Sequence, residues 1–142
     1  VARRTVFESR SDRRLFLAAV ARRVRAGELE LHAFCLMATH YHLLVGSPLG
    51  RLAQAMHRIQ LAYSRAFNRR RKRDGPLVRG RYRSKPVDSL TYRRVLVRYI
   101  DHNPVRARMV VAPDRWPYGS AFLYQRRQGP RWPGSRRTPR RA

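Results

Sequence analysis

The sequence contains few acidic residues and almost no cysteine. Eight Asp and Glu residues stand against 33 Lys and Arg residues, which gives a formal net charge of +25 at pH 7. This imbalance predicts a polyanionic partner, with nucleic acid favoured over an anionic membrane surface. A bias in coding composition could also contribute to the arginine content. The single cysteine, Cys35, excludes a disulfide framework or a cysteine zinc cage within one chain.

The sequence has no long apolar run and no signal-peptide pattern. A membrane-spanning helix needs roughly 18 or more consecutive apolar residues, and no segment approaches that length. We therefore expect a cytoplasmic protein without a membrane partner. The length of 142 residues suits one domain with a modest core. We expect residues 11–124 to form this domain, after an N-terminal stub (1–10) and before a disordered, arginine-rich tail (125–142).

Hydrophobic periodicity changes along the chain in a helix, hairpin, helix order. A helix is predicted from an N-cap at Ser11 or Asp12 to Gly27. Alternation then places residues 29, 31, 33, 35 and 37 on one face of a strand, and a second strand is predicted over residues 40–46. The two strands are expected to pair as an antiparallel hairpin. A long helix is predicted from Leu52, and a third helix is predicted between Asp88 or Ser89 and Pro104.

Two histidines, His40 and His42, are separated by one residue in the second predicted strand. Alternate side chains of a strand share a face, so both imidazoles would point the same way, about 7 Å apart. Tyr41, Leu43 and Val45 would occupy the opposite face. Two imidazoles on one face can hold a divalent metal, although a pair alone leaves the site incomplete. The alternative is a pair of half-buried histidines with no ligand.

Two basic segments are candidate DNA contacts. Arg69, Arg70 and Arg71 belong to a charge run at the end of the long helix. Cations also alternate with other residues in the segment after it: Arg79, Arg81, Arg83 and Lys85. If that segment is a strand, the four charges share one face, where they repel unless a counter-charge such as a phosphate backbone compensates them. A solvated basic surface is the alternative for both segments.

Three sequence motifs follow one another along the chain. They are LHAFCLM leading into HYHLL (residues 31–37 and 40–44), GRYRS (80–84) and RYIDHNPVRA (98–107), with WPYGS at 116–120 as a further match. The sequence in this respect resembles the IS200/IS605-like single-tyrosine (HUH) transposases, and most closely the REP-associated tyrosine transposase branch. The resemblance covers about residues 12–124.

The resemblance implies an α+β, ferredoxin-like antiparallel sheet with helices on one face. Family members carry a strand ahead of the first helix, and this sequence has no segment that matches it. We therefore expect that a second copy can supply an edge in a homodimer. By position, Tyr99 matches the nucleophile, and His40, His42 and Asn103 match the ligands of Mg²⁺ or Mn²⁺, with His102 as a substitute for Asn103. Arg93, Arg94 and Arg98 surround Tyr99 in the sequence without one being singled out.

The implied activity is the cleavage and rejoining of single-stranded or hairpin DNA through a 5′-phosphotyrosine. The alternative is a non-catalytic, degenerate transposase-derived protein that only binds nucleic acid. High basic charge serves both hypotheses equally. The set formed by His40, His42 and Tyr99 is what separates them.

Overall fold

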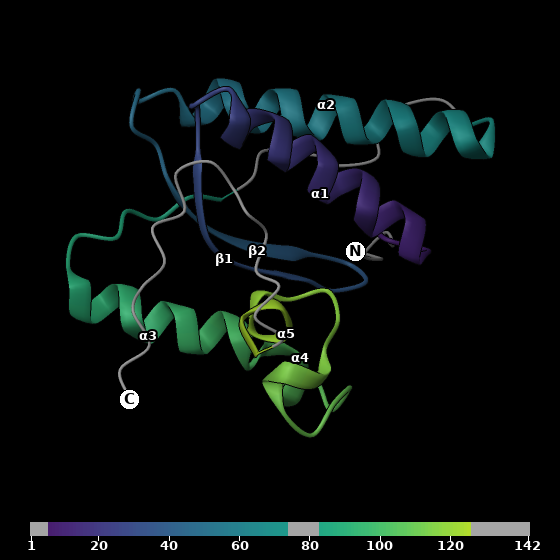
Figure 1. The fold of residues 1–142 in the computed structure, drawn as a ribbon. Helices are drawn as coiled ribbons and strands as arrows, with labels where there is room; N and C mark the ends of the chain where they lie inside the picture. Colours follow the sequence, from purple (N-terminus) through teal and green to yellow (C-terminus); the bar gives the residue numbers. More distant parts are fainter. Residues whose placement is uncertain (1–5, 74–82, 126–142) are drawn as a thin grey trace.

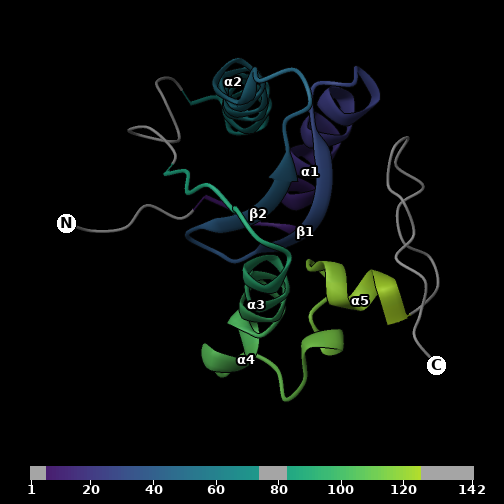
Figure 2. The ribbon, with the colours of Figure 1, turned by 90° about the vertical axis from the view of Figure 1, so that its left-hand side faces the viewer.

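A two-stranded antiparallel sheet lies between two layers of helices (Figures 1 and 2). The computed structural model describes residues 6–73 and 83–125. In chain order the elements are α1 (Arg10–Arg25), β1 (Glu30–Leu36), β2 (Tyr41–Gly46), α2 (Leu52–Arg71), α3 (Leu90–Asp101), α4 (Asn103–Arg106), η1 (Pro113–Arg115) and α5 (Ser120–Gln125). The predicted α+β class and the predicted hairpin are confirmed. In these ranges no helix is long and apolar enough to cross a membrane.

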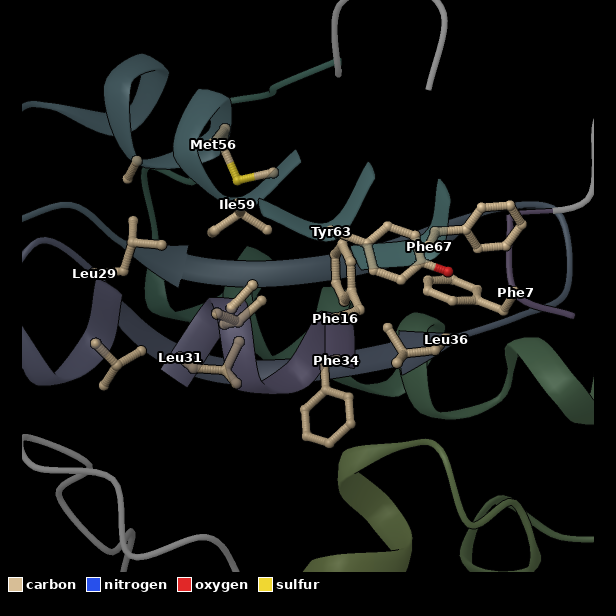
Figure 3. Packing of buried hydrophobic residues seen from close by; sticks show 14 residues of the cluster. Phe7, Phe16, Leu29, Leu31, Phe34, Leu36, Met56, Ile59, Tyr63 and Phe67 are labelled. Carbon is tan, nitrogen blue, oxygen red and sulfur yellow. The ribbon is translucent and has the colours of Figure 1, made fainter. Parts of the chain in front are cut away.

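The helices α1 and α2 cover one face of the sheet, as expected. Their apolar stripes meet the hairpin in a core of aromatic rings, with Phe16, Tyr63 and Phe67 gathered around Phe7 (Figure 3). The third helix, α3, packs on the opposite face, where Ile100 meets the small residues of β1. The sheet is therefore covered on both faces, whereas the sequence led us to expect helices on one face only.

Strand β1 contains a β-bulge that the alternating sequence pattern hides. Leu31 pairs with Val45 and Ala33 pairs with Leu44, so His32 is an extra residue in β1. A bulge makes consecutive side chains share a face. Leu31 therefore lies in the α1–α2 core, whereas Ala33, Cys35 and Met37 lie on the α3 face. The prediction that residues 29, 31, 33, 35 and 37 all share one face is wrong for this reason.

The segment before α1 belongs to the packed domain. Phe7 is 2% exposed, and its backbone amide donates to the carbonyl of Ala38 in the hairpin turn. The N-cap is Ser9 rather than Ser11 or Asp12, because Ser9 and Asp12 form a reciprocal capping box. The last residues of the expected stub (1–10) therefore belong to the packed domain, and Arg10 already begins α1. Residues 6–9 form no strand, and the described sheet consists of β1 and β2.

Residues 116–120 lie along the outer edge of β1, where Gly119 bridges Cys35 on the side away from β2 (Figure 2). The indole of Trp116 donates to the carbonyl of Leu36, the amide of Leu36 donates to the carbonyl of Tyr118, and the amide of Phe34 donates to the hydroxyl of Ser120. These bonds satisfy backbone groups that a bare strand edge would expose. The predicted tail lies outside the described residues except for Gln125, which ends α5.

The predicted basic strand over residues 77–85 is not present in its described part. Arg83 and Lys85 lie in an exposed coil that leads to α3, and Arg79 and Arg81 fall outside the described residues. Alternation of charged residues alone does not make a strand, since no neighbouring strand accepts its hydrogen bonds here. Arg83 and Lys85 therefore do not belong to a strand with four cations on one face.

The carboxylate of Asp12 is fully buried and joins α1 to the end of α2. Its Oδ2 atom lies 2.6 Å from a guanidinium nitrogen of Arg71 and accepts from the amides of Glu8 and Ser9. Burial alone would raise the pKa of Asp12, but the hydrogen bonds from Arg71 and the two amides outweigh it and hold the pKa below its ordinary value of 3.8. The resulting stability is present above pH 3.8 and is lost as the pH falls through the folded-state pKa.

We predict that Asp12→Ala destabilises the fold by about 3–5 kcal/mol, because it leaves Arg71 without its buried partner and removes the capping box. The melting temperature should fall by at least about 6 °C in a calorimetric scan. Arg73→Ala is the matched control, since Arg73 pairs with Glu8 at the surface, where an ion pair contributes about 0–1 kcal/mol. Equal losses in the two variants would contradict this role for Asp12.

Candidate active site

The two histidines of the hairpin lie on the α3 face of the sheet. Tyr41 and Leu43 pack against the α1–α2 core, so alternation turns His42 to the other side, and the predicted division of faces is confirmed. The ring centroids of His40 and His42 are 5.2 Å apart and the rings are nearly perpendicular, at 82°. The turn is closed by the amide of Met37, which donates to the carbonyl of His40.

Tyr99 on α3 lies beside this pair. Its ring centroid is 6.0 Å from that of His42, and its side chain is 51% exposed. The next residue, Ile100, is buried against β1 and β2 and holds this end of α3 to the sheet. At the other end, the hydroxyl of Ser89 accepts from the amide of Tyr92 and caps the helix. The structure therefore brings together the histidines and the tyrosine named from the sequence, with the tyrosine open to solvent.

A hydrogen-bonded link ties the end of α3 to the edge of β1. The hydroxyl of Ser120 lies 3.1 Å from Oδ1 of Asp101, and it accepts from the amide of Phe34. Asp101 follows Tyr99 by two residues, so this link sets the position of Tyr99 along the sheet. Burial raises the pKa of Asp101 above its ordinary value.

Arg106 is a site residue that the sequence analysis did not identify. Its guanidinium carbon lies 4.0 Å from the ring centroid of Tyr99, and the same guanidinium donates to the Tyr99 carbonyl at 2.6 Å. In one straight helix the two residues would be two turns apart. The helix is instead interrupted at His102, with Pro104 in the first turn of α4, and Arg106 on α4 contacts the Tyr99 ring. The proline after Asn103 was the signal that could have indicated it.

The environment of His42 keeps its imidazole neutral. Burial lowers the pKa of His42 below its ordinary value of 6.5, and the nearby charges of His40 and Arg106 lower it further. A neutral imidazole is the form that binds metals. At pH 7 His42 is therefore in the state that metal binding requires.

The expected third metal ligand, Asn103 or its substitute His102, lies just beyond the end of α3. Asn103 begins α4 one helical turn after Tyr99, and its carbonyl accepts from the amide of Ala107. Nδ1 of His102 lies 2.8 Å from the carbonyl of Arg98, so this ring caps the end of α3. Across the described ranges, no three His, Cys, Asp or Glu side chains lie close enough together to hold a metal. A metal on His40 and His42 would need its other ligands from an amide, water or substrate.

Among residues 6–73 and 83–125, the candidate DNA contacts do not form one surface around Tyr99. Arg69 and Arg70 are exposed at the end of α2, on the opposite side of the sheet from α3 (Figure 2). Arg71 is engaged by Asp12 and Glu8 and stacks 3.7 Å from the ring centroid of Phe67, so the structure gives it a role in the fold. Lys85 is exposed, with its Nζ atom 5.6 Å from the ring centroid of Tyr92.

Comparisons with known proteins concern the family and the fold of the chain. The sequence model of the family described as "Transposase IS200 like" matches residues 1–103. A solved structure of a REP-associated tyrosine transposase bound to a REP hairpin superposes with a TM-score of 0.71. The identity is 16%, over 84% of this chain and 71% of that chain, so this likeness concerns the fold. Among curated proteins, no sequence matches.

We predict that Arg106→Gln raises the pKa of His42 toward 6.5, because it removes a positive charge that disfavours the protonated ring. An NMR titration of the histidine ring protons in the metal-free protein measures this change. Arg108→Gln is the matched control, since Arg108 is exposed and lies two residues farther along the chain. The assignment of Arg106 to the site is wrong if the His42 titration is the same in both variants.

Proposed function

The chain belongs to the IS200-like transposase family, and on that premise we propose that it cuts and rejoins single-stranded DNA through a covalent bond to Tyr99. The observation that supports this best is the position of an exposed tyrosine ring 6.0 Å from His42, with His40 beside it. The two residue types that metal-assisted phosphoryl transfer would use here, a nucleophilic tyrosine and metal-binding histidines, therefore meet on one open side of the sheet.

We propose that the substrate is single-stranded DNA next to a hairpin. The net charge of +25 suits a polyanion, and phosphate contacts supply most of the affinity of such proteins. A solved structure with a similar fold is that of a REP-associated tyrosine transposase bound to a REP hairpin. Arg69 and Arg70 would contact a part of the DNA that passes the α2 side, away from the cut. Arg83 and Lys85 are exposed in the coil that precedes α3, the helix that carries Tyr99, and they would contact DNA on that side.

In the proposed first step, the Tyr99 hydroxyl oxygen attacks a DNA phosphorus in line with the 3′ oxygen. The bond between the tyrosine oxygen and phosphorus forms, the bond to the 3′ oxygen breaks, and the strand leaves with a 3′ hydroxyl after taking up a proton. The phenol loses its proton to solvent. A second 3′ hydroxyl can then attack the 5′-phosphotyrosine, which restores a phosphodiester and frees Tyr99.

His40 and His42 would hold a divalent metal in this reaction, with Asn103 as a third ligand. Ring centroids 5.2 Å apart allow one ion to reach both imidazoles, since metal–nitrogen bonds are about 2.0–2.2 Å long. Two nitrogen ligands favour Mn²⁺ over Mg²⁺, and water or phosphate oxygens can complete either shell. When bound, the ion would neutralise and orient the phosphate that Tyr99 attacks.

Arg106 would keep the nucleophile in position. Its planar guanidinium stacks on the Tyr99 ring and holds the adjacent carbonyl, which restricts rotation of the side chain. A phosphate approaching Tyr99 would also meet this positive charge. Holding the reacting atoms in one geometry lowers the entropic part of the barrier.

The alternative function is nucleic-acid binding without catalysis. The basic charge supports it as well as it supports an enzyme. However, binding alone needs no tyrosine beside paired histidines, nor a neutral His42 among cations. These features favour the enzyme.

We predict that a hairpin strand labelled at its 3′ end stays attached to the protein through denaturation after incubation with Mn²⁺. The same strand labelled at its 5′ end should be released, because Tyr99 would hold the new 5′ phosphate. Tyr99→Phe removes only the reacting oxygen and should abolish the adduct while DNA affinity changes less than twofold.

Tyr92→Phe is the matched control, since Tyr92 lies on the same helix two turns earlier. It should leave the adduct in place. An adduct that persists in Tyr99→Phe would assign the nucleophile elsewhere. Tight binding without any adduct would favour the binding-only alternative.

A further prediction concerns the metal. His42→Ala should weaken Mn²⁺ binding at least about tenfold, because it removes a direct ligand and even supporting residues contribute that much. The free Mn²⁺ signal in electron paramagnetic resonance measures this affinity. His57→Ala is the control, since His57 is exposed on α2, on the other side of the sheet. Equal Mn²⁺ affinity in the two variants would contradict a metal at the histidine pair.

A further inference from the structure

A cavity of about 370 Å³ lies between the end of β2 and the start of α3. Leu44 and Gly46 line it from the strand, and Val87, Ser89 and Leu90 line it from the other side. None of these residues has a role in the proposed reaction. We propose that this cavity binds one unstacked base of the DNA strand that Tyr99 cuts. The inference rests on the proposed function and adds a base-binding subsite to it.

The cavity lies on the same face of the sheet as the candidate active site, between the same two elements, β2 and α3. Leu44 follows His42 by two residues and shares its face of the sheet, and Arg93 precedes Tyr99 by six residues on α3. The rise per residue of a strand and of a helix places the cavity roughly 7 to 15 Å from the His42–Tyr99 pair. Successive nucleotides of one strand are separated by at least about 3.4 Å. A base within about four nucleotides of the cut therefore reaches the cavity.

The walls suit a flat ring. Leu44, Val87 and Leu90 contribute apolar surface, and Leu90, at the start of α3, is 61% exposed. Stacking a base on such side chains removes apolar surface from water on both sides. Enzymes that take a base out of the stack use apolar walls of this kind.

His32, the bulge residue of β1, lines this cavity and holds the guanidinium of Arg93 in place there. Arg93 lies 2.8 Å from Nδ1 of His32 and donates to it, so the remaining ring hydrogen is on Nε2, which is 3.5 Å from Oε2 of Glu30. Gly46 leaves room for this arrangement, because a Cβ atom there would lie 3.0 Å from Glu30 Oε2. The guanidinium of Arg93 is thus held at the cavity wall, and it carries further N–H groups.

The polar groups favour a base over a phosphate. Arg93 supplies donors, whereas the carboxylate of Asp88, which also lines the cavity, supplies acceptors and would repel an anion. A nucleobase is neutral and presents both acceptors and donors on its edge. One base can therefore pair with both side chains while its faces contact Leu44 and Leu90.

The test is an abasic scan of a hairpin substrate. Binding to the Tyr99→Phe protein is measured by fluorescence anisotropy, with one base at a time removed on either side of the cut. Loss of the base that enters the cavity should lower affinity roughly fivefold or more, because a stacked base contributes about 1–3 kcal/mol. One position within about four nucleotides of the cut should show this loss.

The variants Leu90→Ser and Arg93→Gln should reduce the penalty at that position, because the base has already lost its contacts. Leu90 and Arg93 are exposed, so neither change threatens folding. Arg94→Gln is the matched control, since it removes the same charge from the next residue of α3 outside the cavity. It should weaken binding at every position alike and keep the penalty.

The base site is refuted if no position shows a penalty, or if the penalty is unchanged in Leu90→Ser and Arg93→Gln. A covalent adduct without a positional penalty would refute the base site and leave the proposed function standing. A positional penalty without an adduct in the wild-type protein would do the reverse. Absence of DNA binding would refute both.

Discussion

The alternation of side chains along β2 is the constraint on which the site depends. Tyr41, Leu43 and Val45 pack into the α1–α2 core, and this burial leaves only the opposite face for His42 and Leu44. A register slip of one residue would expose the aromatic side and bury the histidines, at the cost of several apolar contacts. The core therefore fixes the direction of the His42 imidazole.

Tyr99 reaches His42 because two contacts anchor the C-terminal end of α3 to the sheet. Ile100 packs on the sheet beside it, and Asp101 is tied through Ser120 to the edge of β1. The same C-terminal segment covers backbone groups of that edge. The short helix α4 then places Arg106 against the tyrosine ring. Packing on the sheet, a hydrogen-bonded edge and an interruption of the helix thus combine to assemble one site from distant parts of the sequence.

Much of this arrangement was predictable from the sequence, because periodicity reports which face a side chain occupies. The hairpin, the long helix and the sides taken by His42 and Tyr41 follow from local patterns. The bulge at His32 was not predictable, since apolar residues continue to alternate while the register shifts. Arg71 was taken for a DNA contact because its buried partner, Asp12, lies 59 residues earlier. Arg106 was missed because a helical pattern does not show where the helix is interrupted.

The most direct test of the account identifies the residue that carries the DNA. A 5′-phosphotyrosine adduct can be trimmed with nuclease, digested with trypsin and sequenced by mass spectrometry. Cleavage after Arg98 and Arg106 releases a peptide in which Tyr99 is the single tyrosine, whereas Tyr92 and Tyr41 fall in other peptides. The account predicts the nucleotide on the Tyr99 peptide. A nucleotide on the peptide of Tyr92 or Tyr41 would contradict it.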